Sequence, residues 1–266
     1  MGFYLDTQAT RSTLMSVDTT LSANITAAQD YIPIASTTNF STSVVAEIET
    51  TNEVVSFDSI TTNRAQYSED FTNAFWALDA SGSWSANAGV APDGTTTAEK
   101  YIPDVTSTPY HWFYHYWTTI SNNTFSIYAK ADGYDYISLI FYRGATSSSG
   151  VQFNLATGVV VTSQTATGAI ESVGDGWYRC SIFPASSTNA GYGIVTPNDG
   201  GTPDTSNFFL TTYAGDGAKG VLVWGAQLET TALTGYLPNS TGGDLSGLTT
   251  VTRGVNGTTA TLASSG

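Results

Sequence analysis

The sequence TFSIYAKADGYDYISLIFY, residues 124–142, contains the pattern that most clearly predicts the fold. In residues 124–130 apolar and polar side chains alternate, as they do along a strand with one buried face. Asp132-Gly133 is a turn signal, and residues 136–142 then repeat a strand pattern rich in aromatic and β-branched side chains. The segment therefore predicts two consecutive β-strands.

The middle of the chain contains several more short strand patterns separated by turn residues. Such a series, at near-regular spacing, predicts a sandwich or a barrel. The frequent Thr, Ser, Gly and Asn suit strands and tight turns, and no segment has the pattern of a long helix. The other expected strands are residues 151–155 with 159–161, 170–173 with 177–180, and 220–228.

The two ends of the chain predict a second, smaller β-domain. Residues 44–48 and 54–57 read as a hairpin, and residues 248–252 form a strand candidate before the Asn256-Gly257 turn signal. Two or three short strands bury little area, so we expect the C-terminal strand to lie beside the N-terminal hairpin. Domain insertion is tolerated where chain termini lie close together.

The predicted organisation is therefore an insertion. Residues 17–63 plus 245–266 would form the small discontinuous β-domain, and residues 64–244 the larger domain. Residues 1–16 carry few strand signals, which leaves two alternatives: an N-terminal arm that docks on a neighbouring subunit, or a loose terminus.

Charge and cysteine content exclude several classes of function. The formal net charge is −14, and the basic residues are scattered singly, so we expect no nucleic-acid partner. Cys180 is the only cysteine, which excludes an intrachain disulfide, and its alternating surroundings predict a buried thiol. The N-terminus lacks the pattern of a cleaved leader, and no run reaches the roughly 20 apolar residues of a membrane span, so we expect no membrane partner.

Several blocks of the middle segment occur in the order found in one known family: YSEDFTNAFW (67–76), APDGTTTAEK (91–100), FSIYAKADG (125–133), FNLATG (153–158), GDGWYRC (174–180) and WGAQLE (224–229). They resemble the jelly-roll domains, akin to carbohydrate-binding modules and concanavalin A-like lectins, that recur in phage structural proteins. The flanks IPIASTTNF (32–40) and VTRGVNGTTA (251–260) resemble two ends of a small β-module of phage tail and fibre-like proteins.

The resemblance implies an all-β fold, a jelly-roll β-sandwich inserted into a small β-domain. It further implies a structural component of a bacteriophage virion, tail- or fibre-associated, on the head or tail surface and assembled in the host cytoplasm. The expected partners are other virion proteins, in a homotrimer, together with a host surface glycan. Two alternatives remain: a capsid-surface decoration protein, or a glycan-binding host adhesin.

The aromatic run PYHWFYHYW, residues 109–117, is the candidate glycan site, because pyranose rings stack on flat indole and phenol faces. Only one face of a strand can line the core. We expect the other face to contact a neighbouring subunit, since exposed aromatic patches more often mark protein contacts, and glycan binding by that face is the alternative. Strand alternation separates Tyr110, Trp112, Tyr114 and Tyr116 from His111, Phe113, His115 and Trp117.

A catalytic or metal site is less apparent. Glycoside hydrolysis needs two carboxylates about 5–10 Å apart, and Glu171 and Glu229 have no evident link, so we expect no enzyme and no catalytic residue. A histidine packed among aromatic side chains is expected to be structural. Related modules often hold a structural calcium, so the resemblance implies Glu69, Asp70 and Glu229 as its oxygen ligands and no other cofactor.

Overall fold

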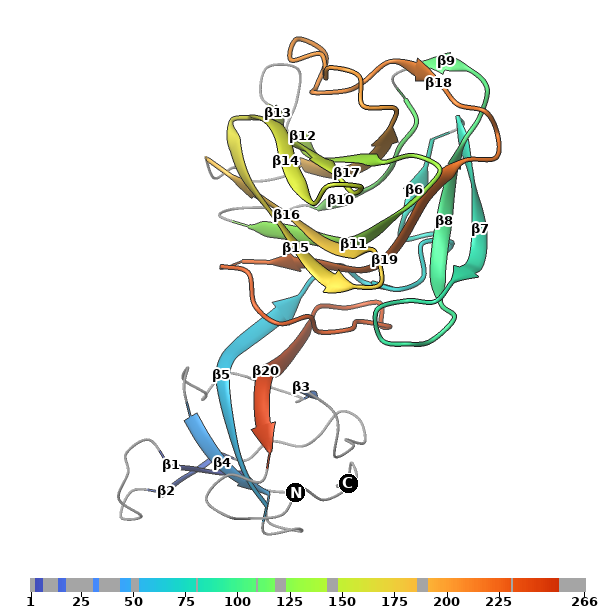
Figure 1. The fold of residues 1–266 in the computed structure, drawn as a ribbon. Coiled ribbons are helices and arrows are strands. Elements are labelled where there is room, and N and C mark those ends of the chain that lie inside the picture. Colours follow the sequence, from blue (N-terminus) through green and yellow to red (C-terminus); the bar gives the residue numbers. More distant parts are fainter. Residues whose placement is uncertain are drawn as a thin grey trace. The chain divides into compact units, whose positions relative to one another are not determined.

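The computed structural model describes residues 3–6, 14–17, 31–33, 44–48, 53–79, 81–108, 110–117, 123–142, 148–185, 191–230 and 232–253, and the side chains between residues 62 and 245 within these ranges. The chain divides into two compact units (Figure 1). The smaller contains Met1–Arg64, Thr234–Leu237 and Gly243–Gly266, and the larger contains Ala65–Leu233 and Pro238–Gly242.

The smaller unit contains one six-stranded antiparallel sheet. Residues from both ends of the chain form it, because Val251 pairs with Phe57. Residues 1–16, which we expected to be an arm or a loose terminus, contribute two strands, in which Leu5 pairs with Met15. The strand order is β2 (Leu14–Val17), β1 (Phe3–Asp6), β4 (Val44–Ile48), β5 (Glu53–Asn63), β20 (Leu245–Arg253) and β3 (Tyr31–Pro33).

Two six-stranded antiparallel sheets form the larger unit (Figure 1). Sheet I has the order β14 (Val159–Gln164), β13 (Ser148–Asn154), β12 (Tyr136–Tyr142), β17 (Gly191–Asn198), β10 (Phe113–Trp117) and β6 (Ala77–Leu78). Sheet II has the order β15 (Ala166–Gly174), β16 (Trp177–Pro184), β11 (Thr124–Asp132), β19 (Gly220–Glu229), β8 (Ala98–Pro103) and β7 (Gly82–Gly89). A short ribbon pairs β9 (Ser107–Thr108) with β18 (Tyr213–Ala214).

A single hydrophobic core joins the two sheets. Leu139 and Phe141 of sheet I and Ile127 and Ile182 of sheet II are buried in the same cluster. Because successive side chains on a strand point to opposite faces, each strand contributes every second residue to this core. The larger unit is therefore a β-sandwich.

The all-β jelly-roll prediction is confirmed, and the described residues contain no helix, hence none long and apolar enough to cross a membrane. The predicted hairpins appear as β13–β14 and β15–β16. Gly133 follows β11 (Thr124–Asp132) directly and has a φ of +107°, a conformation that glycine adopts without steric cost. The two strands around it lie in different sheets, so this turn carries the chain from sheet II to sheet I.

Candidate functional site

The outer face of sheet I, which points away from sheet II, has two rows of apolar side chains. Strand pairing aligns Tyr116 on β10 with Tyr192 on β17, and Tyr192 with Tyr142 on β12. The next outward row contains Tyr114, Ile194 and Ile140. Side chains at directly opposed positions share a face, so these rows lie next to each other across three strands.

Seven aromatic rings form a continuous network on this face, which we call the aromatic platform. Its central ring is Tyr192, whose centroid lies 5.5 Å from Tyr114, 4.9 Å from Tyr116 and 5.7 Å from Tyr142. The outermost rings continue the network in both directions, with Tyr110 5.2 Å from Trp112 and Phe208 4.6 Å from Tyr142. The platform consists of Tyr110, Trp112, Tyr114, Tyr116, Tyr142, Tyr192 and Phe208.

Solvent reaches the platform at several points. Tyr110 is 44% exposed and Tyr116 is 45% exposed, while the remaining five rings are half-buried. Large aromatic side chains are normally more completely buried, and an exposed aromatic cluster of this kind commonly marks a binding surface. The platform is therefore the strongest candidate site among the described residues.

The loop of residues 199–212 covers the rest of the outer face. Phe209 of this loop is 1% exposed and packs against Gly150 of β13, where an added Cβ would lie 2.3 Å from the Phe209 ring. Phe208 and Phe209 have φ values of +57° and +63°. This left-handed conformation costs about 1–2 kcal/mol for a residue with a side chain, and the packing of Phe209 on Gly150 offsets that cost.

Polar side chains lie beneath the same loop. Gln152 Nε2 donates to Asn198 Oδ1 at 2.9 Å and to the carbonyl of Gly201 at 3.0 Å. Asn198 Nδ2 in turn donates to Ser138 Oγ at 3.2 Å. These groups are buried and each makes a hydrogen bond, so they hold the loop on the sheet. The loop therefore leaves the aromatic platform as the open part of the outer face.

The structure separates the predicted aromatic run as strand alternation indicates. Tyr114 and Tyr116 lie on the outer face, whereas Phe113 and Trp117 are buried in the core. All four predicted glycan-site residues, Tyr110, Trp112, Tyr114 and Tyr116, belong to the platform. Sequence analysis missed Tyr142, Tyr192 and Phe208, although alternation against Ile137, Leu139 and Phe141 was a signal for the outward position of Tyr142.

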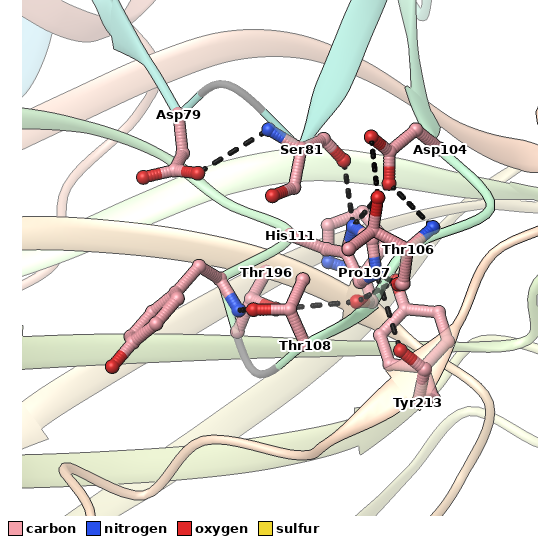
Figure 2. Close-up of polar contacts among 10 residues, drawn as sticks. Asp79, Ser81, Asp104, Thr106, Thr108, His111, Thr196, Pro197 and Tyr213 are labelled. Atoms are coloured by element: carbon pink, nitrogen blue, oxygen red, sulfur yellow. Dashed lines mark hydrogen bonds and ion pairs between the residues drawn. The ribbon is translucent and has the colours of Figure 1, made fainter.

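Both histidines lie on the inner side of this segment. His115 stacks on Phe75 with ring centroids 3.5 Å apart, and its Nδ1 lies 2.6 Å from the Phe75 carbonyl. Burial lowers the pKa of His115, with partial opposition from that hydrogen bond. His111 is completely buried among three backbone carbonyls (Figure 2). Neither histidine is placed to act on a ligand that lies on the platform.

The predicted calcium ligands occupy two different environments. Glu69 and Asp70 line a pocket of about 280 Å³ together with Tyr67, Ser68, Pro238, Asn239 and Ser240. Glu229 is 1% exposed, and its Oε2 lies 4.0 Å from Arg179 Nη2. Within the described side chains, no group of three acidic, histidine or cysteine residues could hold a metal ion. Calcium binding by these three residues stays a prediction.

The carboxylates of Glu171 and Glu229 do not form a glycosidase pair. Glu171 lies on β15 and Glu229 at the end of β19, with β16 and β11 between them in sheet II. Three strand spacings and about five residues along the strand place them roughly 20 Å apart. A glycosidase needs about 5–10 Å between its two carboxylates.

No protein-family model and no curated protein matches the chain. Among solved structures, the chain is similar to the CBM22-1–GH10 modules of endo-1,4-β-D-xylanase 10B from Clostridium thermocellum, complexed with xylohexaose. The TM-score is 0.32 and the sequence identity is 13%. The alignment covers 67% of this chain and 29% of the xylanase chain.

Proposed function

We propose that the larger unit is a carbohydrate-binding domain and that the aromatic platform on sheet I is its glycan-binding surface. The observation that carries this proposal is the continuous network of seven partly exposed rings on the outer face of a sandwich sheet. Aromatic rings offer flat apolar faces for the C–H groups of a sugar, and tyrosine hydroxyls add hydrogen bonds at the edge.

The charge of the site favours a neutral glycan. The side chains of the platform are phenols, an indole and a phenyl ring, and no carboxylate or basic side chain is among them. The whole chain has a formal net charge of −14, which repels an anionic polysaccharide. An uncharged polysaccharide chain therefore fits this surface better than a polyuronate or a sialylated glycan.

Binding is tested with isothermal titration calorimetry against neutral and anionic oligosaccharides. Replacing Tyr116 or Tyr192 by Ala removes a ring from the centre of the network, and we expect each change to weaken binding about tenfold. Val160→Ala is the matched control, because Val160 is 39% exposed on β14, away from the platform. If wild type binds no glycan, or the tyrosine variants bind as tightly as Val160→Ala, the proposal is wrong.

We further propose that this domain is displayed by a bacteriophage virion protein, as a tail- or fibre-associated component. The support for this part is the resemblance of residues 32–40 and 251–260 to phage β-modules. Locating the chain at symmetric positions on an imaged particle would support the proposal, and head density would identify a capsid decoration. Release of reducing sugar by the purified protein would contradict the expected absence of enzymatic activity.

A further inference from the structure

The turn of residues 204–210 carries two adjacent phenylalanines that lie in different environments. Asp204 closes the turn, because its amide donates to the Leu210 carbonyl at 2.8 Å and its carbonyl accepts from the Phe209 amide at 2.9 Å. Phe209 is buried against sheet I, whereas Phe208 is half-buried and belongs to the aromatic platform. The turn is therefore anchored by one ring and presents the other to the platform.

The backbone of Phe208 has a conformation that its side chain disfavours. Its φ of +57° lies in the left-handed region, which glycine adopts without steric cost and phenylalanine does not. Phe209 has a φ of +63°, but its packing on Gly150 offsets the cost. Phe208 is not buried in this way. Residues held in such conformations cluster at ligand-binding sites, so the strain at Phe208 indicates a role of its ring in binding.

Phe208 and Tyr142 form two sides of a corner on the platform. Their ring centroids are 4.6 Å apart and their planes are inclined by 74°. The Tyr192 ring is nearly parallel to that of Tyr142, at an angle of 25° and a centroid distance of 5.7 Å. All three rings are half-buried and reach solvent. A sugar unit in this corner places apolar C–H groups against ring faces on two of its sides at once.

The other rings of the platform are also steeply inclined to one another. Tyr192 makes an angle of 53° with Tyr116 and 75° with Tyr114, and Trp112 makes an angle of 83° with Tyr114. A flat surface of packed polysaccharide chains contacts several rings face-on only when these rings share one plane. The platform therefore fits the sides of a single chain better than a flat surface.

Hydrogen bonds within the turn keep the Phe208 ring in place. The amide and the hydroxyl of Ser206 both donate to Asp204 Oδ1, at 2.8 and 2.6 Å. Gln164 Nε2 on β14 donates to the carbonyl of Thr205 at 3.2 Å, which ties the turn to sheet I. A side chain that is already held in its binding position loses little conformational entropy when a ligand arrives.

We propose that Phe208 is the specificity-determining residue of the platform: it forms one side of a corner that holds a sugar unit on two sides, and it thereby selects a single glycan chain over the flat surface of an insoluble polysaccharide. The selection rests on the glycan-binding function proposed above. The left-handed backbone that places the ring is a property of the fold and is tested without a glycan.

The first experiment compares the stabilities of Phe208→Gly and Phe208→Ala. Both changes remove the ring, but only glycine relieves the strain of a positive φ. We therefore expect chemical denaturation to give a higher midpoint for Phe208→Gly than for Phe208→Ala. If Phe208→Ala is as stable as Phe208→Gly or more stable, the backbone of this residue is not left-handed and the proposed corner is wrong.

The second experiment is isothermal titration calorimetry with maltohexaose, cellohexaose and N-acetylchitohexaose as soluble neutral chains. For a hexasaccharide that wild type binds, we expect Phe208→Tyr to keep the affinity and Phe208→Gly and Phe208→Ala each to lower it about tenfold. Thr205→Ala is the matched control, because it removes an exposed side chain of the same turn and leaves Phe208 in place. If Phe208→Gly binds as tightly as wild type, the ring does not contact the glycan and the proposal is overturned.

The third experiment tests the shape of the ligand separately from its chemistry. Crystalline cellulose and crystalline chitin have the sugar units of two of the hexasaccharides but present them as flat surfaces. We expect wild type to stay in the supernatant when these particles are sedimented, and retention on either of them would overturn the selection of single chains.

The outcomes separate the specificity of Phe208 from the glycan-binding function. If Tyr192→Ala weakens the binding of a hexasaccharide while both Phe208→Gly and Phe208→Ala bind as wild type does, the platform binds glycans and only the role of Phe208 is wrong. If wild type binds none of the soluble chains and neither crystalline polysaccharide, both proposals are overturned.

Discussion

Replacement of Glu99 by Gln tests the energetics of the sandwich, because this side chain is a buried carboxyl group. Glu99 lies on β8, is 5% exposed, and its Oε2 accepts a 2.6 Å hydrogen bond from the Phe71 amide. Burial, with a smaller contribution from Asp70, raises its pKa from 4.5 to about 7, although the amides of Phe71 and Thr72 favour the charged form.

The magnitude follows from linkage between protonation and folding. A group whose pKa is raised in the folded state adds stability below its unfolded pKa, and that stability is lost as the pH rises through the folded pKa. At about 1.4 kcal/mol for each pH unit, the rise from 4.5 to about 7 corresponds to about 3 kcal/mol. Glutamine keeps the carbonyl acceptor for Phe71 and has no charge to bury.

The assay is chemical denaturation of wild type and Glu99→Gln at pH values from about 4 to about 8. All six tryptophans lie in the larger unit, so their fluorescence reports its unfolding. As the pH rises through this range, we expect the free energy of unfolding of the variant to increase by up to about 3 kcal/mol relative to that of wild type. Glu171→Gln on the exposed face of β15 is the control and should follow wild type. If the free energies of unfolding of wild type and Glu99→Gln differ by the same amount at every pH in the range, the reasoning is refuted.

Three further changes test other parts of the sandwich. Burial raises the pKa of the Cys180 thiol, so a disulfide reagent should modify it only after unfolding, and fast reaction of the native protein would contradict this. Gly150→Ala should cost about 1–3 kcal/mol by displacing Phe209, whereas Gly242→Ala in the same unit, where an added Cβ would lie 3.4 Å from the Tyr67 hydroxyl, should cost little in the same denaturation assay. Because burial lowers the pKa of His115, stability should fall as the pH decreases below about 6.5, and His115→Gln should remove that part of the decrease.

The local pattern of the sequence is sufficient to predict the individual strands of the sandwich. Alternation with a period of two is a property of neighbouring residues, so the order of the amino acids alone separates Tyr114 and Tyr116 from Phe113 and Trp117. The same pattern predicts the strands before and after Gly133. It does not predict that these two strands belong to different sheets, because sheet membership depends on pairing with distant segments.

Only the tertiary structure determined which rings form the platform. Tyr142 and Tyr192 join Tyr116 through the register of three strands that are far apart in the sequence, and a shift of one residue would turn them to the opposite face. The environment of His111 also depends on long-range packing, since its carbonyl partners come from three separate segments. Local alternation is therefore sufficient to assign the side chains that share a face of each strand. The tertiary structure decided which face is buried and which side chains meet there, because strand pairing and sheet packing bring together residues that no local pattern connects.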